Sequence, residues 1–248
     1  MHIGTRLRTR LRTRCAVGKK TGSKSGSKTG KSTGRKTGNA VIATVTAVAL
    51  CSGAWLLSGG AGTQPPPQPS AAQAASAGPG IRPQPPAASR APGIAPLPPS
   101  PPDRVRIPSI GVDTPLMGLG LTRQGSLDVP PPERKNLAGW YEAGTTPGER
   151  GTAIVAGHVD NQEGPAVFYE LGALRKGRTI EVERRDGSVA VFTVDANEVY
   201  DAKDFPDQKV YGAAARPELR VITCGGKYSK QTGYQGNVVV FAHLTSVR

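Results

Sequence analysis

A proline-rich segment, residues 59–102, divides the chain and limits where a folded core can form. It consists almost entirely of Pro, Ala, Gly, Ser and Gln. Such a composition buries too little apolar surface to offset backbone entropy, and its prolines favour extended polyproline conformations. We therefore expect residues 59–102 to be a disordered linker and residues 103–248 to form one domain with its own core.

Charge is distributed just as unevenly. Twelve of the 32 Lys and Arg residues precede residue 38, with no acidic residue among them, whereas 18 basic residues balance all 18 acidic residues after residue 102. Residues 1–39 have no Phe, Tyr or Trp to stack on a base and no apolar periodicity. We interpret them as a disordered cytoplasmic arm that signals topology or contacts anionic lipid, and we expect no nucleic-acid partner.

An uncharged apolar run follows the arm at residues 40–58. Its first eighteen residues, 40–57, would span about 27 Å as a helix, close to the ~30 Å thickness of a hydrocarbon core. The basic flank predicts a single-pass protein of the cell membrane with a cytoplasmic N-terminus and an extracellular domain. A cleaved signal peptide is the alternative, because the small residues "SGGAG" follow the apolar run.

Residues 103–248 contain mainly strand patterns. Alternating apolar runs such as "RVRIPSIGV", "RTIEVERRDGSVAVFTVDANEVY" and "NVVVFAHL" are separated by Gly, Pro and Asp or Asn. Residues 185–188 are typical of a hairpin turn, because Gly187 tolerates a positive φ. Helical patterns are limited to residues 164–177 and "AAARPEL". The residues therefore predict a mostly β barrel or sandwich with short helices.

Cys224 and His158 are the candidates for chemistry. Cys224 is the one cysteine within residues 103–248, so no disulfide can form inside this domain. It ends the run "LRVITC" before two glycines, and His158 ends the run "TAIVAGH". An imidazolium near a thiol lowers the thiol pKa from about 8.5 and can protonate a leaving group. The pair predicts acyl transfer, and the alternative is a buried strand cysteine with an uninvolved turn histidine.

The sequence requires no metal or organic cofactor. A zinc site formed by His158, Cys224 and His243 is conceivable, but it lacks the short ligand spacing of CxxC or HExxH. We expect His243 to face solvent near the C-terminus instead. We also interpret Trp140 and Tyr141 as core residues.

The order of these motifs resembles that of the sortases, the membrane-anchored cysteine transpeptidases of Gram-positive bacteria. "AGH" after a strand is followed about 65 residues later by "TC" and another apolar strand. The stretches "NLAGWYEAGTTPGERGTAIVAGHVDNQEG" and "VITCGG" are similar to the class F sortases, and the resemblance covers residues 103–248. It implies an eight-stranded β-barrel with short helices, preceded by a transmembrane helix and linker.

The resemblance also implies a mechanism and partners. Cys224 would attack the Thr–Gly carbonyl of an LPXTG-like sorting signal at the C-terminus of a secreted protein, and His158 would protonate the leaving amine. An amine of a peptidoglycan precursor or of a pilin would then resolve the thioester. Two alternatives keep the fold: a peptide-binding module with little or no activity, and a cysteine peptidase that uses water as the acceptor.

One departure from the family concerns the residue that stabilises the oxyanion. Sortases generally carry an Arg near the start of the strand after the Cys loop, where this sequence has Asn237. A neutral amide is a weaker donor than a guanidinium. Thr223, the backbone N–H of Gly225 and Lys227 are further candidates for substrate binding. Asp160 is a candidate for orienting the imidazole or contacting substrate.

Overall fold

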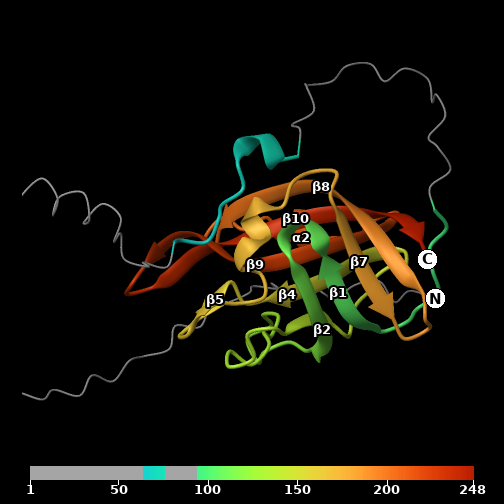
Figure 1. Ribbon diagram of the computed structural model, residues 1–248, viewed down its shortest axis with the longest axis horizontal. Helices are drawn as coiled ribbons and strands as arrows, with labels where there is room; N and C mark the ends of the chain where they lie inside the picture. Colours follow the sequence, from blue (N-terminus) through green and yellow to red (C-terminus); the bar gives the residue numbers. More distant parts are fainter. Residues whose placement is uncertain (1–63, 76–93) are drawn as a thin grey trace, which may run out of the picture. The chain divides into compact units, whose positions relative to one another are not determined.

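The structure is a computed structural model that describes residues 64–75 and 94–248. Eight strands form a closed barrel in the order β1-β2-β3-β4-β9-β10-β8-β7 (Figure 1). These strands are β1 (Pro102–Ile107), β2 (Val112–Leu119), β3 (Ala138–Tyr141), β4 (Gly151–Gly157), β7 (Thr179–Arg184), β8 (Val189–Asp201), β9 (Pro217–Ser229) and β10 (Gly233–Val247). The predicted mostly β fold with an eight-stranded barrel is confirmed.

The remaining elements are short. A small two-stranded sheet and a single described α-helix accompany the barrel, together with three described 3-10 helices. They are β5 (Asp160–Asn161), β6 (Gly164–Pro165), α2 (Asp207–Tyr211), η1 (Ala71–Gln73), η2 (Pro108–Ile110) and η3 (Tyr169–Ala173).

The predicted arm (residues 1–39) and apolar span (residues 40–58) lie outside the described residues. Within residues 64–75 and 94–248, no helix combines the length and the apolar character that crossing a membrane requires.

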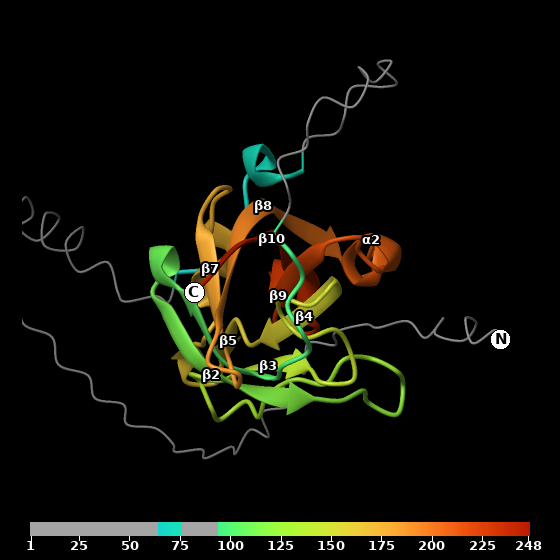
Figure 2. The same ribbon diagram turned by 90° about the vertical axis from the view of Figure 1, so that its right-hand side faces the viewer.

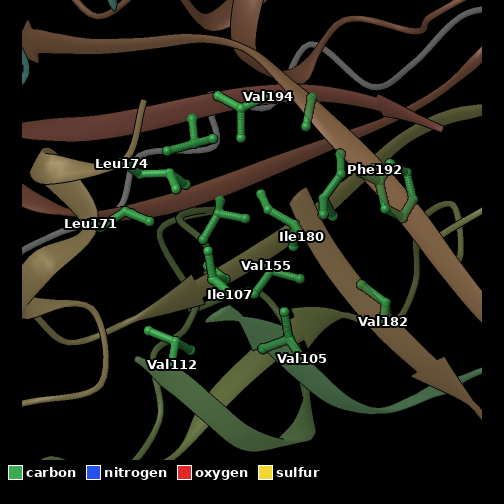
Figure 3. Packing of buried hydrophobic residues seen from close by; sticks show 14 of the residues in the cluster. Val105, Ile107, Val112, Val155, Leu171, Leu174, Ile180, Val182, Phe192 and Val194 are labelled. Carbon is green, nitrogen blue, oxygen red and sulfur yellow. The ribbon is translucent and has the colours of Figure 1, made fainter. Parts of the chain in front are cut away.

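The barrel closes around apolar side chains that alternate along its strands. Figure 3 shows Val105, Val155 and Ile180 gathered with Phe192 in the barrel interior, and all four are buried. Each such side chain contributes roughly 1.5–3 kcal/mol when it is fully buried. Trp140 belongs to the same buried cluster, as predicted. Tyr141 packs against a second cluster at the other face of the sheet.

Most neighbouring strands are antiparallel, but β2 runs parallel to β3, and β4 runs parallel to β9. The β4–β9 register pairs Ile154 with Arg220 and Ala156 with Ile222. Because parallel strands point the same way, the residues that follow β4 lie next to the residues that follow Ile222. The predicted hairpin at residues 185–188 joins β7 to β8, and Gly187 has a φ of 84° there.

The helices differ from the sequence prediction. Residues 164–177 begin as β6 and then form the short helix η3. The carbonyls of Leu171 and of the C-cap residue Leu174 accept from Asn197 Nδ2 at 2.8 and 2.9 Å. "AAARPEL" forms no helix, since its Pro217 already begins β9. Helix α2 forms instead in "DFPDQKVYG", where Pro206 supplies a suitable N-terminal boundary.

Parts of the predicted linker contact the barrel. Ile94 and Leu97 pack against the main core, and the buried guanidinium of Arg184 donates to the Pro98 carbonyl at 2.5 Å. Residues 66–75 also make hydrogen bonds to barrel residues. The packed domain therefore includes residues on the N-terminal side of the predicted boundary at residue 103.

Candidate active site

The parallel register of β4 and β9 directs His158 and Cys224 to the same end of the sheet. The last recorded pair is Ala156 with Ile222, so a continuation by one residue places Gly157 beside Thr223. A second step places His158 beside Cys224. Continued in this way, the register places the two predicted catalytic residues, 66 positions apart in sequence, on neighbouring segments at the end of β4.

Cys224 does not end its strand, contrary to the sequence prediction. Strand β9 continues to Ser229 because β10 remains paired with it beyond the end of β4. Cys224 is half-buried at the point where β9 loses β4 as a neighbour. Cys224 is disulfide-bonded in the structure. It can act as a nucleophile only after this disulfide is reduced to the thiol.

Thr223 of β9 forms a hydrogen bond to the end of β4. Its hydroxyl donates to the Gly157 carbonyl at 2.9 Å, and its exposed fraction is only 2%. This bond extends the contact between β4 and β9 by one residue toward the site. A side chain predicted to contact substrate therefore also positions the peptide that precedes His158.

The imidazole of His158 is oriented by a backbone carbonyl. Nε2 lies 2.7 Å from the Pro130 carbonyl oxygen. Because a carbonyl only accepts, Nε2 must carry a proton, and Nδ1 is left to exchange a proton with a substrate. The backbone around His158 is fixed as well, since Phe168 N–H donates to its carbonyl at 3.0 Å.

Glycine at position 157 permits this packing. A Cβ there would lie 2.7 Å from Phe168 Cδ2 and 2.8 Å from Val167 Cγ1, closer than side chains tolerate. The "AGH" pattern therefore has a steric reason: Gly157 lets the chain after His158 fold back closely against the end of β4.

Asn237 lies directly opposite Cys224 on β10. Directly opposed residues in antiparallel strands place their side chains on the same face of the sheet. Asn237 is 4% exposed, and its Nδ2 donates to the Thr223 carbonyl at 3.3 Å. The amide has a second N–H, so one donor can serve the strand while the other serves a ligand.

Asp160 has a partner that the sequence did not suggest. Its carboxylate accepts from the Tyr234 hydroxyl at 2.6 Å, whereas Nε2 of His158 bonds Pro130. Burial and this bond to Asp160 raise the pKa of Tyr234 above its usual value of 10.0. The Tyr234 ring also lies 5.0 Å from that of Tyr228. The hydrogen bond between Asp160 and Tyr234 links the segment after His158 to the β9–β10 hairpin.

The glycines after Cys224 have distinct tasks. A Cβ on Gly225 would lie 2.6 Å from Val238 Cγ2, so only glycine fits against β10. Gly226 has a φ of 77°, which favours glycine, and its N–H donates to Gln68 Oε1 at 2.9 Å. Lys227 is exposed.

The residues of the conceivable zinc site have other positions and partners in the structure. His243 Nδ1 lies 2.8 Å from Asp195 Oδ1, and position 243 is six residues along β10 from Asn237. Within residues 64–75 and 94–248, no three His, Cys, Asp or Glu side chains are grouped so that they could hold a metal ion.

Sequence reasoning missed three groups at this site. The Pro130 carbonyl is a backbone atom and leaves no pattern in the sequence. Tyr234 and Gln68 act through contacts with residues 74 and 158 positions away, which only the fold reveals. In the sequence, Tyr234 could have been noticed because it is an aromatic residue shortly after Cys224.

Comparison with known proteins identifies the family. The family described as "Sortase domain" matches residues 105–245, which is more than half of the chain. The chain therefore belongs to the sortase family, whose members are cysteine transpeptidases. A comparison with curated proteins finds no match.

Similar solved structures include several sortases. Sortase A of Listeria monocytogenes is 18% identical with a TM-score of 0.43, over 58% of this chain and 87% of that one. The sortase D5 transpeptidase of Clostridium perfringens is 23% identical with a TM-score of 0.43, over 58% and 78%. Streptococcus agalactiae sortase C1, solved in complex with MTSET, is 18% identical with a TM-score of 0.46, over 59% and 70%.

Proposed function

We propose that the chain is a class F-like sortase that cleaves an LPXTG-like sorting signal of secreted proteins and transfers the acyl group to an amine. The observation that carries the proposal is the parallel register that sets His158 beside Cys224, held by the Thr223 bond to the Gly157 carbonyl. Membership of the sortase family supports the same assignment.

In the first half-reaction, the Cys224 thiolate attacks the Thr–Gly carbonyl carbon, and the carbonyl oxygen becomes an oxyanion. The second N–H of Asn237 is the proposed donor to that oxyanion. The C–N bond then breaks, and His158 gives the proton of Nδ1 to the departing glycine nitrogen. The products are a thioester on Cys224 and a free amine.

In the second half-reaction, an amine attacks the thioester carbon and neutral His158 takes up the amine's proton. The C–S bond breaks, which restores the thiolate and the imidazolium. The proposed acceptors are an amine of a peptidoglycan precursor and a pilin lysine. The proposed membrane anchor at residues 40–58, with its cytoplasmic arm, would keep the domain at the extracellular surface of the cell membrane, where both substrates emerge.

The test measures how much cleaved and how much ligated product the reduced full-length chain forms in detergent micelles. An LPXTG-type peptide is incubated with and without triglycine, and products are separated by mass spectrometry. We expect a ligated product that depends on triglycine and disappears in Cys224→Ala and His158→Ala. Cleavage that ignores triglycine would indicate a peptidase, and no cleavage with any motif would indicate a binding module.

A further inference from the structure

Residues 66–75, called the strap from here on, bind the barrel beside the candidate active site. In Figure 1 the strap is the teal segment, and Figure 2 shows its helix η1 next to β8. Gly226 N–H donates to Gln68 Oε1 at 2.9 Å, and Lys176 N–H donates to Gln73 Oε1 at 2.8 Å. Two glutamines of the strap thus accept from backbone N–H groups of β9 and of the segment between η3 and β7.

The Gln68 carboxamide is held in one orientation. Its Nε2 donates to the Pro66 carbonyl at 3.2 Å, which leaves Oε1 to accept from Gly226. An amide oxygen that accepts from a backbone N–H two residues after Cys224 has the same chemistry as a peptide carbonyl. The strap therefore occupies a donor that an incoming peptide substrate could use.

The far end of the strap is anchored by charge. Ala75 N–H donates to Glu198 Oε1 at 2.7 Å, and Lys209 pairs with the same carboxylate. Burial alone would raise the pKa of Glu198, but the bonds from Lys209, Tyr200 and Ala75 together lower it. The carboxylate is therefore ionised at neutral pH and remains an acceptor for the strap. The Lys176 ammonium also donates to the Ala74 carbonyl.

The barrel surface is shaped to admit the strap. A Cβ on Gly172 of η3 would lie 1.8 Å from the Pro67 carbonyl oxygen and 2.6 Å from its carbon. Any residue other than glycine would have to displace the strap backbone. Helix η3 follows His158 by eleven residues and Gly226 follows Cys224 by two. The strap thus bridges the segments that follow the two proposed catalytic residues.

We propose that the strap is a peptide bound in cis that competes with peptide substrate for the approach to Cys224. A covalently linked segment competes at an effective concentration on the order of millimolar, so a weak substrate is excluded until the strap is released. The consequence for turnover rests on the proposed function, whereas the docking itself does not.

The first test removes the contact at Gln68. In the reduced full-length chain, Gln68→Ala is compared with Gln124→Ala, a change at an exposed glutamine before β3. Peptide mass spectrometry measures iodoacetamide labelling at Cys224 separately from Cys15 and Cys51. We expect Gln68→Ala to label about three to ten times faster, the ratio that corresponds to one lost hydrogen bond. We expect Gln124→Ala to match the native chain.

The second test displaces the strap from the barrel side. Gly172→Ala inserts a methyl group against Pro67, and Gly120→Ala is the matched control because a Cβ there meets nothing within 4 Å. Hydrogen exchange followed by mass spectrometry reports on peptides that contain Gly226. We expect faster exchange and faster Cys224 labelling in Gly172→Ala and native behaviour in Gly120→Ala.

The two proposals fail in distinguishable ways. Faster labelling and exchange without any transpeptidation would sustain the strap and refute the proposed function. If both Gln68→Ala and Gly172→Ala keep the native rates of Cys224 labelling and hydrogen exchange, the proposal for the strap is refuted, whatever their activity. A fall in kcat/KM in these variants would also overturn it, because the strap would then form part of the substrate site rather than compete with substrate.

Discussion

Replacing Thr223 with valine tests how the two strand ends of the site are held together. Valine keeps the β-branched shape but removes the hydroxyl that donates to the Gly157 carbonyl. Because Gly157 and Thr223 are buried, we expect the loss of this hydrogen bond to cost about 1 kcal/mol. For a domain of this size, that loss lowers the melting temperature by roughly 2–5 °C.

The same change should affect catalysis more than it affects folding. His158 directly follows the peptide that Thr223 fixes, so the imidazole would lose its register with Cys224. We expect kcat/KM for peptide transfer to fall about tenfold or more. The assay measures ligated product at 25 °C, where the variant remains folded, and Thr179→Val at an exposed strand position is the control. Equal kcat/KM in Thr223→Val and Thr179→Val would refute the reasoning.

Three further predictions follow from other contacts. Asn237→Ala should lower kcat by about 10²–10³ if its amide stabilises the oxyanion, and an undiminished kcat in transfer assays would remove that role. Burial and the bond to Glu198 raise the pKa of Tyr200 to about 12, so its stabilising contribution is complete below pH 10 and is lost as pH rises through 12. Urea denaturation at pH 9 and pH 11.5 should show this loss in the native chain, and Tyr200→Phe should reduce it; an equal loss in both would contradict the assignment. Arg184→Met should destabilise the chain by about 2–4 kcal/mol in the same assay, since the buried guanidinium bonds the Pro98 and Pro147 carbonyls. Exposed Arg185→Met should be nearly neutral, and equal losses would show that those buried bonds are not stabilising.

The strands were predictable because their pattern is local. Alternation in "RTIEVERRDGSVAVF" and the glycine in its turn determine a hairpin whatever surrounds it. Helical segments were less predictable, because Gly172 and Pro165 limit residues 164–177 to one short 3-10 turn. The prediction that this strand ends at Cys224 is wrong, because β9 continues to Ser229. Two glycines usually interrupt a strand, but here Gly225 is required for close packing against Val238.

The candidate site could be predicted in its residue types but not in its contacts. Cys224 and His158 stand out as the chemically reactive residues of two apolar runs. Their adjacency depends on the parallel register of β4 and β9, which no local pattern specifies. Likewise, Gln68 lies in a low-complexity segment whose composition predicts only an extended chain. Its bond to Gly226 depends on the folded barrel surface.

The most direct test of the central claim is to trap the acyl-enzyme. The reduced full-length chain is mixed with an LPXTG-type peptide without an amine, quenched in acid and digested, and the thioester is located by mass spectrometry. We predict the acyl fragment, ending at the threonine of the motif, on Cys224 and its release by added triglycine as a ligated peptide. An acyl fragment on another residue, or a ligated product formed by Cys224→Ala, would contradict the account.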